Sequence, residues 1–534
     1  MPAALTYPGV YIQEVPSGVR TITGVATSIT AFVGRAAAGP TDDPQMLTSY
    51  ADYERRFGGL DVTCPMSYAV RDFYLNGGTL ALVVRVVHED AGTAAISLPG
   101  SGSPADNLVL DASSAGAWGN RLSAAVDFGS DRAVATSPQI DETRFNLRVR
   151  YQPRAGRDSF VFESFGSVST NPADGRYLPL VLERESTFVR ALGTVPGVRP
   201  EATPAGSWIA ADGNGSDGSA IDDGDVLGEE LPKTGIYALN RADLFNLLCI
   251  PPLARDTTTL PSGYTMPRAD TYANALALCE QRRAVLLVDP DPIWGATISG
   301  ALDAAIDGRN ALNLSGSNAR NAALYFPAVR MVDPLRDSRV DTFAPSGIIA
   351  GVIARTDVQR GVWKAPAGLD ASLNGVQDLQ VNLNDLENGQ LNPLGINCLR
   401  SFGVNGRVVW GARTLRGADA AADEYKYLPV RRLALYLEES LYRGTQWVVF
   451  EPNDEPLWAQ VRLNVGAFMQ GLFRQGAFQG ASPRDAYFVK CDSQTTTQND
   501  INLGVLNVIV GFAPLKPAEF VVIQIQQMAG QIPT

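Results

Sequence analysis

The sequence predicts a multidomain protein of mixed α+β and α/β structure. Three observations lead to this prediction: the chain has 534 residues, strand and helix patterns alternate in its middle, and other regions are rich in strands alone. At about 100–200 residues per domain, this length allows roughly three domains. We expect an α/β middle domain, a β-rich insertion before it and an α+β domain after it, with an extended segment at each end.

The middle of the chain carries the α/β signal. We expect strands at 245–251, 284–289 and 322–332, separated by helices near 269–283 and 297–312. Strands and helices that alternate in this way are typical of βαβ units and a partly parallel sheet.

The regions on either side have different patterns. Residues 94–200 favour a β-rich insertion, because polar and apolar residues alternate from Phe145 to Tyr151 and helix patterns are scarce. A polar segment at 212–225 has the composition of a loop.

Two amphipathic helices are predicted near the C-terminal end. The first runs from about Val430 to Arg443 with leucines along one face, and the second begins after Asn453 or Asp454, with Pro456 in its first turn.

Both ends of the chain are predicted to be strands without a neighbouring hairpin partner. VYIQEV at 10–15 and FVVIQIQQ at 520–527 alternate in the way that strands do. Strand edges expose unpaired backbone groups, so these strands must pair either within their own fold or with another chain. The sequence pattern alone leaves both alternatives open.

Composition excludes several classes of function. The net charge of -12 repels nucleic acid and anionic membranes. His88 is the single histidine, which rules out multi-histidine metal sites. The five cysteines are far apart and form no CxxC pair, so we expect reduced thiols in the core. No apolar run approaches the roughly 20 residues of a bilayer span, and the first residues do not match a secretory signal.

No motif supports catalysis. GNGSDG at 213–218 matches GxGxxG, but no strand precedes it and the aspartates Asp222, Asp223 and Asp225 would repel a phosphate, so a polar turn is expected. The aspartates also lack the spacing of a calcium-binding loop. His88 is expected at the surface, at a strand end. The sequence therefore assigns no catalytic, cofactor-binding or metal-binding residue.

Several longer segments together carry a family resemblance. They are YPGVYIQEVPSG near the start, AFVGRAAAGP at 31–40, NGGTLALVVRV at 76–86, AWGNRL at 117–122, APSGIIAGVIARTDVQRGVWKAPAG at 344–368, LNPLGINCLRSFG, YKYLPVRRLALYLEESLYRGTQWVVFEPNDEPLW, AYFVKCD and PAEFVVIQIQ. With these segments the chain resembles the sheath protein of contractile phage tails and related extracellular injection particles.

The resemblance implies a structural subunit that is not an enzyme. Such subunits form stacked hexameric rings around an inner tube, and they contract to drive the tube through a target envelope. The implied domains are an N-terminal arm and linker (1–33), part of the core (34–93), a β-rich outer insertion (94–205), an α/β middle domain (206–389), an inner tube-binding domain (390–518) and a C-terminal arm (519–534).

The resemblance also implies interaction sites and partners. The terminal strands would complete a sheet in neighbouring subunits through Val10, Tyr11, Ile12, Val15, Phe520, Val521, Val522, Ile523 and Ile525. A helix of the inner domain would face the tube; we favour the second C-terminal helix, through Arg462, Gln470 and Arg474, and the helix from Val430 to Arg443 is the alternative. The expected partners are further copies of the chain, the inner tube protein, and baseplate and cap proteins. Co-assembly with sheath paralogues is left open. Neither a cofactor nor nucleic acid is expected.

The resemblance implies assembly in the bacterial cytoplasm and later a place in a virion or released particle. Two alternatives remain: a baseplate or cap component of the same machine, and a hydrolase-like α/β enzyme that uses the predicted sheet.

Overall fold

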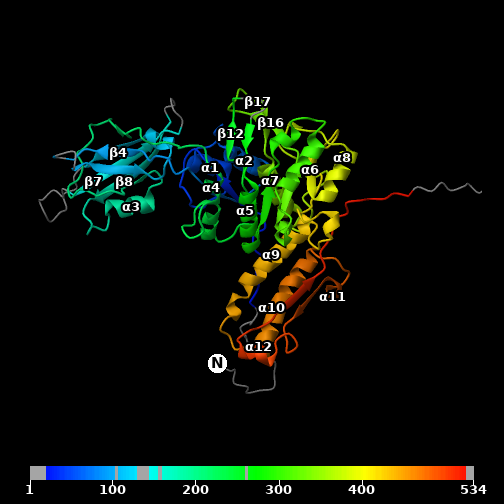
Figure 1. Ribbon diagram of the computed structural model, residues 1–534. Helices are drawn as coiled ribbons and strands as arrows, with labels where there is room; N and C mark the ends of the chain where they lie inside the picture. The colour runs from blue at the N-terminus through cyan, green and yellow to red at the C-terminus, as the bar shows by residue number, and fades with distance from the viewer. Residues whose placement is uncertain are drawn as a thin grey trace, which may run out of the picture. The chain divides into compact units, whose positions relative to one another are not determined.

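The computed structural model describes residues 20–524 except 101, 103–105, 129–142, 154–158 and 259–262. The chain divides into two units, whose elements are labelled in Figure 1. Unit 1 contains the described residues up to Thr27, Asp357–Ala365, and the described residues from Tyr427 onward. Unit 2 contains Ser28–Thr356 and Pro366–Lys426.

Unit 2 is built on an eight-stranded sheet with the order β2-β3-β1-β11-β14-β15-β19-β20. The strands from β3 to β19 pair in parallel, whereas the edge strands β2 and β20 are antiparallel to their neighbours. Their bounds are Gln45–Leu47 (β2), Ala81–Arg85 (β3), Thr30–Gly34 (β1), Leu247–Cys249 (β11), Val285–Val288 (β14), Ala322–Phe326 (β15), Ile396–Phe402 (β19) and Gly406–Val409 (β20). The central strands are buried throughout and mostly apolar, as expected for a sheet covered on both faces. The sheet confirms the predicted mixed α/β class.

Helices in the connections between strands cover this sheet (Figure 1). Their bounds are Tyr50–Phe57 (α1), Pro65–Leu75 (α2), Asp223–Leu227 (α4), Ala269–Gln281 (α5), Ala301–Ala311 (α6), Ser346–Arg360 (α7) and Asp385–Leu391 (α8). Short 3-10 helices span Ala117–Arg121 (η2), Gly235–Arg241 (η3), Pro292–Gly295 (η4), Ser317–Asn321 (η5), Asn392–Leu394 (η6) and Asp419–Ala421 (η7). The predicted helices near 269–283 and 297–312 correspond to α5 and α6.

Helix α7 packs directly against α2 because two glycines let the backbones approach. A Cβ atom at Gly347 would lie 2.8 Å from Cα of Ala69, and one at Gly351 would lie 2.5 Å from the carbonyl oxygen of Phe73. Carbon atoms in ordinary contact lie about 3.5–4.0 Å apart. No side chain larger than hydrogen therefore fits at this crossing.

The prediction of one strand over 322–332 is wrong, because the chain forms two strands there. β15 ends at Phe326, Pro327 follows, and β16 (Val329–Asp333) joins a separate sheet of order β17-β16-β18. Proline has no amide hydrogen to donate to a ladder, so it ends the pairing in the main sheet. The remaining short strands here are Arg339–Phe343 (β17), Asp378–Leu379 (β18), Ala254–Asp256 (β12) and Gly263–Thr265 (β13).

A buried arginine connects β12 to β16 and β17. The Arg255 guanidinium donates to Oδ2 of Asp333 and to Oδ2 of Asp341, each at 2.8 Å. It also lies over the rings of Tyr68 and Phe343, 5.2 and 4.8 Å from their centres. The three charged side chains are almost completely buried, so each carboxylate depends on this cation for its charge balance.

Between β3 and α4, unit 2 contains a β-rich region with its own core. It has two sheets, of order β10-β6-β7-β8 and β4-β5-β9. The elements are Ala95–Leu98 (β4), Leu108–Ala112 (β5), Leu122–Asp127 (β6), Arg144–Tyr151 (β7), Val161–Ser169 (β8), Leu178–Glu185 (α3), Val189–Arg190 (β9) and Ile209–Ala210 (β10). Every second residue of β7 is buried, which confirms the alternation predicted over Phe145–Tyr151.

Unit 1 is an α+β unit with two long helices. Its elements are Leu428–Gly444 (α9), Gln446–Val448 (η8), Glu455–Arg474 (α10), Pro483–Ala486 (α11), Tyr487–Lys490 (β21), Gln498–Asn502 (α12) and Ile509–Phe512 (β22). Both predicted C-terminal helices are confirmed: Asp454 caps α10 through a hydrogen bond from the amide of Leu457. The core of the unit includes Ile22, Leu433, Val461 and Met469.

A buried ion pair in unit 1 joins three segments that are distant in sequence. The Arg432 guanidinium donates to Oδ1 of Asp357 at 2.8 Å and to the carbonyl oxygen of Thr27 at 2.8 Å. The Thr27 hydroxyl donates to Oδ2 of Asp357 at 2.7 Å. The first described segment, the end of α7 and α9 are thus fixed to one another.

Two further expectations concern the burial of the cysteines and the absence of a membrane-spanning helix. All five cysteines are buried and unpaired, which confirms the prediction of core thiols. Among the described residues, no helix combines the length and the apolar character needed to cross a membrane.

Candidate assembly site

The small sheet of unit 1 has only two strands in the described part of the chain. β21 and β22 are antiparallel, and Tyr487 pairs with Phe512 while Lys490 pairs with Ile509. An isolated pair of strands is marginally stable in water, and its outer edges carry backbone groups that can pair with another strand. This sheet is therefore a suitable acceptor for an additional strand.

The segment after β22 carries exposed apolar side chains. Phe520, Val521, Val522 and Ile523 are 75–83% exposed and belong to no strand or helix. Just before them, a carboxylate oxygen of Glu519 accepts a hydrogen bond from the Tyr427 hydroxyl at 3.1 Å, within unit 1. Burying a side chain of this size contributes about 1.5–3 kcal/mol, so the segment gains stability when another surface covers it.

The other predicted arm residues lie outside the described part of the chain. They are Val10, Tyr11, Ile12, Val15 and Ile525. The first described residue, Arg20, is held on unit 1: its guanidinium lies 4.8 Å from the ring centre of Trp447, and its amide donates to Oδ1 of Asn464 at 3.2 Å.

Helix α10 carries the three residues that the sequence placed on a tube-facing surface. The Arg462 guanidinium contacts the carbonyl oxygen of Cys491, the residue after β21. Oε1 of Gln470 accepts a hydrogen bond from the Tyr487 hydroxyl at 2.8 Å. Arg474, at the helix end, is exposed. Two of the three side chains thus bind the β21 region of their own unit.

A different stripe of α10 is exposed. Gln460, Leu463 and Ala467 lie three or four residues apart on one face, and Leu463 is 56% exposed. Sequence reasoning missed this stripe because it looked for charged residues. The available signal was the spacing of neutral residues opposite the apolar core face of the helix.

The main sheet of unit 2 bears on the enzyme alternative. In doubly wound sheets, ligands bind at the carboxyl ends of the strands where the strand order reverses, which here is between β1 and β11. Arg85, at the carboxyl end of β3 beside β1, is 1% exposed and donates to the carbonyl oxygens of Ala36, Gly39 and Ala115 at 2.7–3.0 Å. Burial lowers the pKa of Arg85 to about 10. The Arg85 side chain thus occupies the carboxyl ends of β1 and β3, on the side of β1 away from β11.

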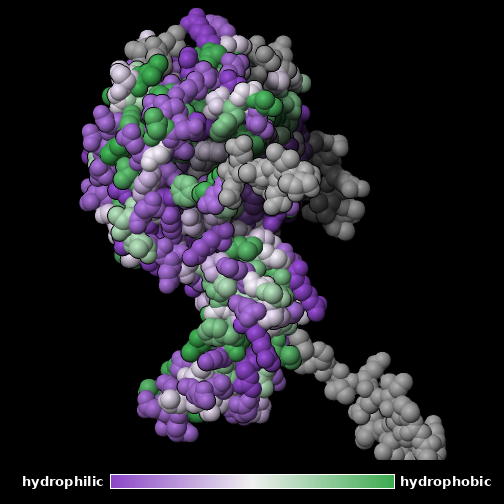
Figure 2. Space-filling model, turned by 90° about the vertical axis from the view of Figure 1, so that its right-hand side faces the viewer, coloured by the Kyte–Doolittle hydropathy of each residue, from purple (hydrophilic) through white to green (hydrophobic). Residues whose placement is uncertain are grey.

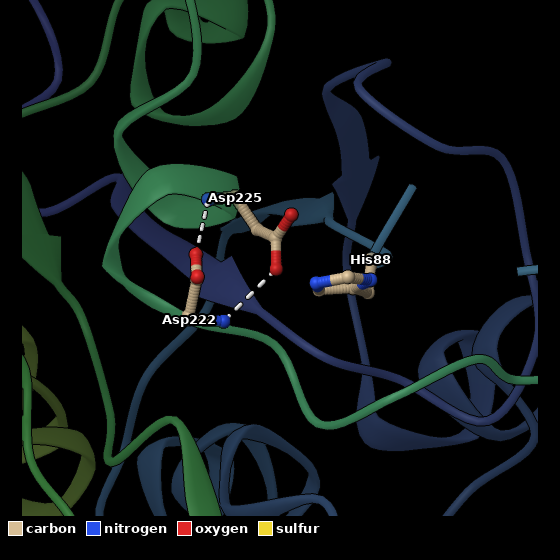
Figure 3. Close-up of side chains that lie close together, drawn as sticks. All are labelled: His88, Asp222 and Asp225. Carbon is tan, nitrogen blue, oxygen red and sulfur yellow. Dashed lines mark hydrogen bonds between the residues drawn. The ribbon is translucent and has the colours of Figure 1, made fainter. Parts of the chain in front are cut away.

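His88 lies close to two aspartates near the start of α4 (Figure 3). Its ring and the carboxylates of Asp222 and Asp225 place one potential ligand atom each within 4.8 Å of one another. Nδ1 of His88 lies 2.8 Å from Oδ1 of Asp90, and this hydrogen bond, followed by the charges of Asp225 and Asp222, raises the pKa of the histidine. With a side chain 26% exposed, His88 is half-buried and less accessible than expected.

Both aspartates cap the helix. Asp222 Oδ1 accepts from the amides of Gly224 and Asp225, and Asp225 Oδ2 accepts from the amide of Asp222 at 2.9 Å. The predicted polar loop at 212–225 therefore ends in a capping box and the first turn of α4. These hydrogen bonds explain the aspartates without a ligand.

Two family models match consecutive parts of the chain. The phage tail sheath protein central domain matches residues 271–415, and the phage tail sheath C-terminal domain matches residues 421–528. The tail sheath protein of Enterobacteria phage T4 is 23% identical over 254 residues, and that of Vibrio phage KVP40 is 28% identical over 175 residues. These alignments cover 46% and 33% of this chain but only 36% and 24% of the two relatives, so the chain matches about a third or less of their length.

A solved structure matches almost the whole fold. The anti-feeding prophage helical sheath in the contracted state is 24% identical, with a TM-score of 0.56 over 98% of this chain and 99% of that one. The domain matches and this fold define a protein of the phage tail sheath class. The domain matches, the two relatives and the sheath fold together support a contractile tail sheath protein of the kind found in phage tails and phage tail-like contractile injection systems.

Proposed function

We propose that this chain is the self-assembling subunit of a contractile sheath, and that its role is structural and not enzymatic. Subunits form stacked hexameric rings around an inner tube, and a change of the lattice shortens the cylinder and drives the tube forward. Assembly takes place in the bacterial cytoplasm, and the sheath then becomes part of a virion or a released particle. The inner tube, the baseplate and a cap protein are its partners.

The observation that carries this proposal is the pairing of an exposed arm with an open acceptor sheet. Phe520–Ile523 are exposed in the isolated subunit, and among the described strands β21 and β22 pair only with each other. In the assembled sheath, this arm and the N-terminal segment around Val10–Val15 complete the β21–β22 sheets of neighbouring subunits by strand addition. With about six backbone hydrogen bonds of roughly 0.5–1.5 kcal/mol each, one arm contributes about 3–9 kcal/mol.

Helix α10 is our proposed contact with the tube. Arg474 is available at its exposed end, while Arg462 and Gln470 connect the helix to β21 and so couple the tube contact to the strand-acceptor sheet. Ring formation and tube contact are then two functions of one small unit. The domain match and the likeness to a helical sheath support this arrangement.

Proline substitutions in the arm test the proposal. The Val521→Pro/Ile523→Pro variant loses two amide donors, so we expect it to form no cylinders at concentrations at which the unchanged chain does. The matched variant Val521→Ala/Ile523→Ala keeps both amides and should still assemble, although less readily. Sedimentation and negative-stain microscopy measure the product.

The melting temperature of the isolated subunit provides the control. Both arm residues are exposed and unpaired in the described subunit, so neither variant should change it. Cylinders formed by the proline variant at the original concentration would contradict the shared-strand mechanism.

A further inference from the structure

Two stretches of chain connect the β-rich region to the rest of unit 2. Residues 86–94 lead from β3 to β4, and residues 211–222 lead from β10 to α4. We call them the outgoing crossing and the returning crossing. They pair with each other, because the amides of Gly92 and Ser216 each donate to the other residue's carbonyl oxygen, at 2.9 and 3.0 Å. The attachment of the β-rich region therefore depends on how firmly the two crossings are joined.

A carboxylate joins the crossings at a second point. Oδ1 of Asp90 accepts a hydrogen bond from the amide of Ser219 at 2.8 Å, and Oδ2 accepts one from the Ser219 hydroxyl at 2.7 Å. These hydrogen bonds lower the pKa of Asp90 to about 2, so the carboxylate stays ionised over the pH range in which a histidine titrates. Nδ1 of His88 lies 2.8 Å from Oδ1 of this carboxylate.

The other side of the His88 ring faces the returning crossing and α4. In Figure 3 the ring points toward the carboxylate of Asp225, and Asp222 lies beside that carboxylate. On its own crossing, His88 is followed by Glu89 and Asp90, and the charge of Glu89 also acts on Asp225. The histidine of one crossing is thus surrounded by acidic groups of both.

Further charged groups lie around this site. Asp42, between β1 and β2, feels the charge of Asp225 and the opposite charge of Arg241, and burial raises the pKa of both aspartates. Asp223 has its own partner, because its carboxylate accepts a hydrogen bond from the amide of Arg268 at 2.7 Å. Asp42 and Asp225 are therefore the groups near His88 whose titration must be separated from that of the ring.

Protonation of His88 adds a positive charge where the two crossings meet. The hydrogen bond to Asp90, followed by the charges of Asp225 and Asp222, raises the pKa of the ring. A pKa that is higher in the folded than in the unfolded chain means that the protonated ring favours the folded arrangement. This stabilisation is fully present below about pH 6.5, the ordinary pKa of histidine, and it is lost as the pH rises through the folded-state pKa.

We propose that His88 makes the attachment of the β-rich region sensitive to pH: the protonated ring holds the outgoing and returning crossings together, and the neutral ring lets them open more often. The hydrogen bonds of Gly92 with Ser216 and of Asp90 with Ser219 do not require the protonated ring, so the crossings stay joined in both states. A partly exposed ion pair changes the frequency of local opening rather than the fold. This inference concerns the single subunit and does not depend on the proposed assembly.

Titration of the one histidine in the chain provides the first test. With isotope-labelled histidine and no histidine tag, the nuclear magnetic resonance signal of the ring belongs to His88 alone. In EDTA, its midpoint in the unassembled subunit should lie above about pH 6.5. Asp225→Asn should lower this midpoint, because asparagine keeps an oxygen for the amide of Asp222 and loses only the charge. A midpoint at or below that of a free histidine, or one that Asp225→Asn leaves unchanged, would overturn the proposal.

Hydrogen exchange provides the second test. Mass spectrometry of peptides that cover residues 86–94 and 211–222 measures how often the crossings open. After correction for intrinsic exchange rates, lowering the pH from about 8.5 to about 5.5 should increase their protection about threefold more in the unchanged chain than in His88→Gln. Glutamine can still donate to Asp90 but carries no charge. The same pH dependence in both proteins would show that the ring does not control the junction.

Helix α8 provides an internal control for the exchange experiment. Asn384 and Glu387 form a capping box there, as Asp222 and Asp225 do in α4, but without a histidine. This helix lies on the side of the molecule that faces the viewer in Figure 2. Its protection should be the same in the unchanged chain and in His88→Gln at each pH. A difference in α8 as large as that in the crossings would indicate a global change in stability and contradict a local role of His88.

Discussion

Replacing Gly351 by alanine should destabilise unit 2 by forcing α7 away from α2. The added Cβ would lie 2.5 Å from the carbonyl oxygen of Phe73 and 2.7 Å from Cβ of Asn76, about 1 Å closer than ordinary contact allows. Phe73 lies in α2 and Asn76 is the residue that caps its C-terminal end, so the helices must separate. Overpacking of this kind costs about 1–3 kcal/mol.

A second glycine provides the control for this measurement. Gly389 lies in α8, and a Cβ atom there would meet nothing within 4 Å. Alanine is intrinsically better than glycine in a helix by about 1 kcal/mol, and both variants share this gain. The difference between them therefore isolates the packing cost.

Urea unfolding of the unassembled subunit, followed by circular dichroism, measures both variants. We expect Gly389→Ala to unfold at a slightly higher urea concentration than the unchanged chain, and Gly351→Ala to unfold at a clearly lower one. Equal midpoints for the two variants would refute the close-packed crossing of α2 and α7.

Three other changes test buried charges. Arg255→Met leaves two buried carboxylates without a cation and should lower the free energy of unfolding by about 3–5 kcal/mol in urea titrations, whereas adding Asp333→Asn and Asp341→Asn should recover much of the loss. Arg432→Met should reduce the protection of unit 1 against proteolysis, because Asp357 is then buried alone; unchanged cleavage rates would argue against this role. Burial raises the pKa of Asp289 to about 7, against the lowering effect of its hydrogen bonds from Ser346. The folded state thus retains a proton that the unfolded chain loses above about pH 4, so the free energy of unfolding should fall as pH rises from about 4 to 7, and Asp289→Asn should flatten this dependence in unfolding experiments across that range.

The parts of the fold that follow local rules could be predicted from the sequence. Helix α10 was placed within one or two residues, because Asp454 is a good cap, Pro456 suits a first turn and the apolar spacing is regular. The predicted strand over 322–332 failed because its apolar pattern continues across Pro327, and only the pairing partners reveal that β15 and β16 belong to different sheets.

The candidate site was predictable only in part, for a physical reason. Alternation at Phe520–Ile523 predicted a strand without a local partner; in the structure these residues are exposed and belong to no strand, so the predicted pairing with another chain stays a prediction. The partners of Arg462 and Gln470 could not be predicted, because β21 approaches α10 only after the chain has turned back on itself. The partners of Arg85 could not be predicted for the same reason. The carbonyl oxygens that it binds include those of Ala36, 49 residues before it, and Ala115, 30 residues after it.

Unit 1 is built from segments that are far apart in the sequence, and this has a consequence for synthesis in the cell. Its core combines Ile22, near the start of the chain, with residues as late as Cys491, and β22 ends only at Phe512. A ribosome must therefore translate the chain as far as Phe512 before the β21–β22 sheet can form. Under the proposed strand exchange, nascent chains on one polysome would fold unit 2 side by side without capturing each other's strands, and polymerisation would wait until β22 has been made.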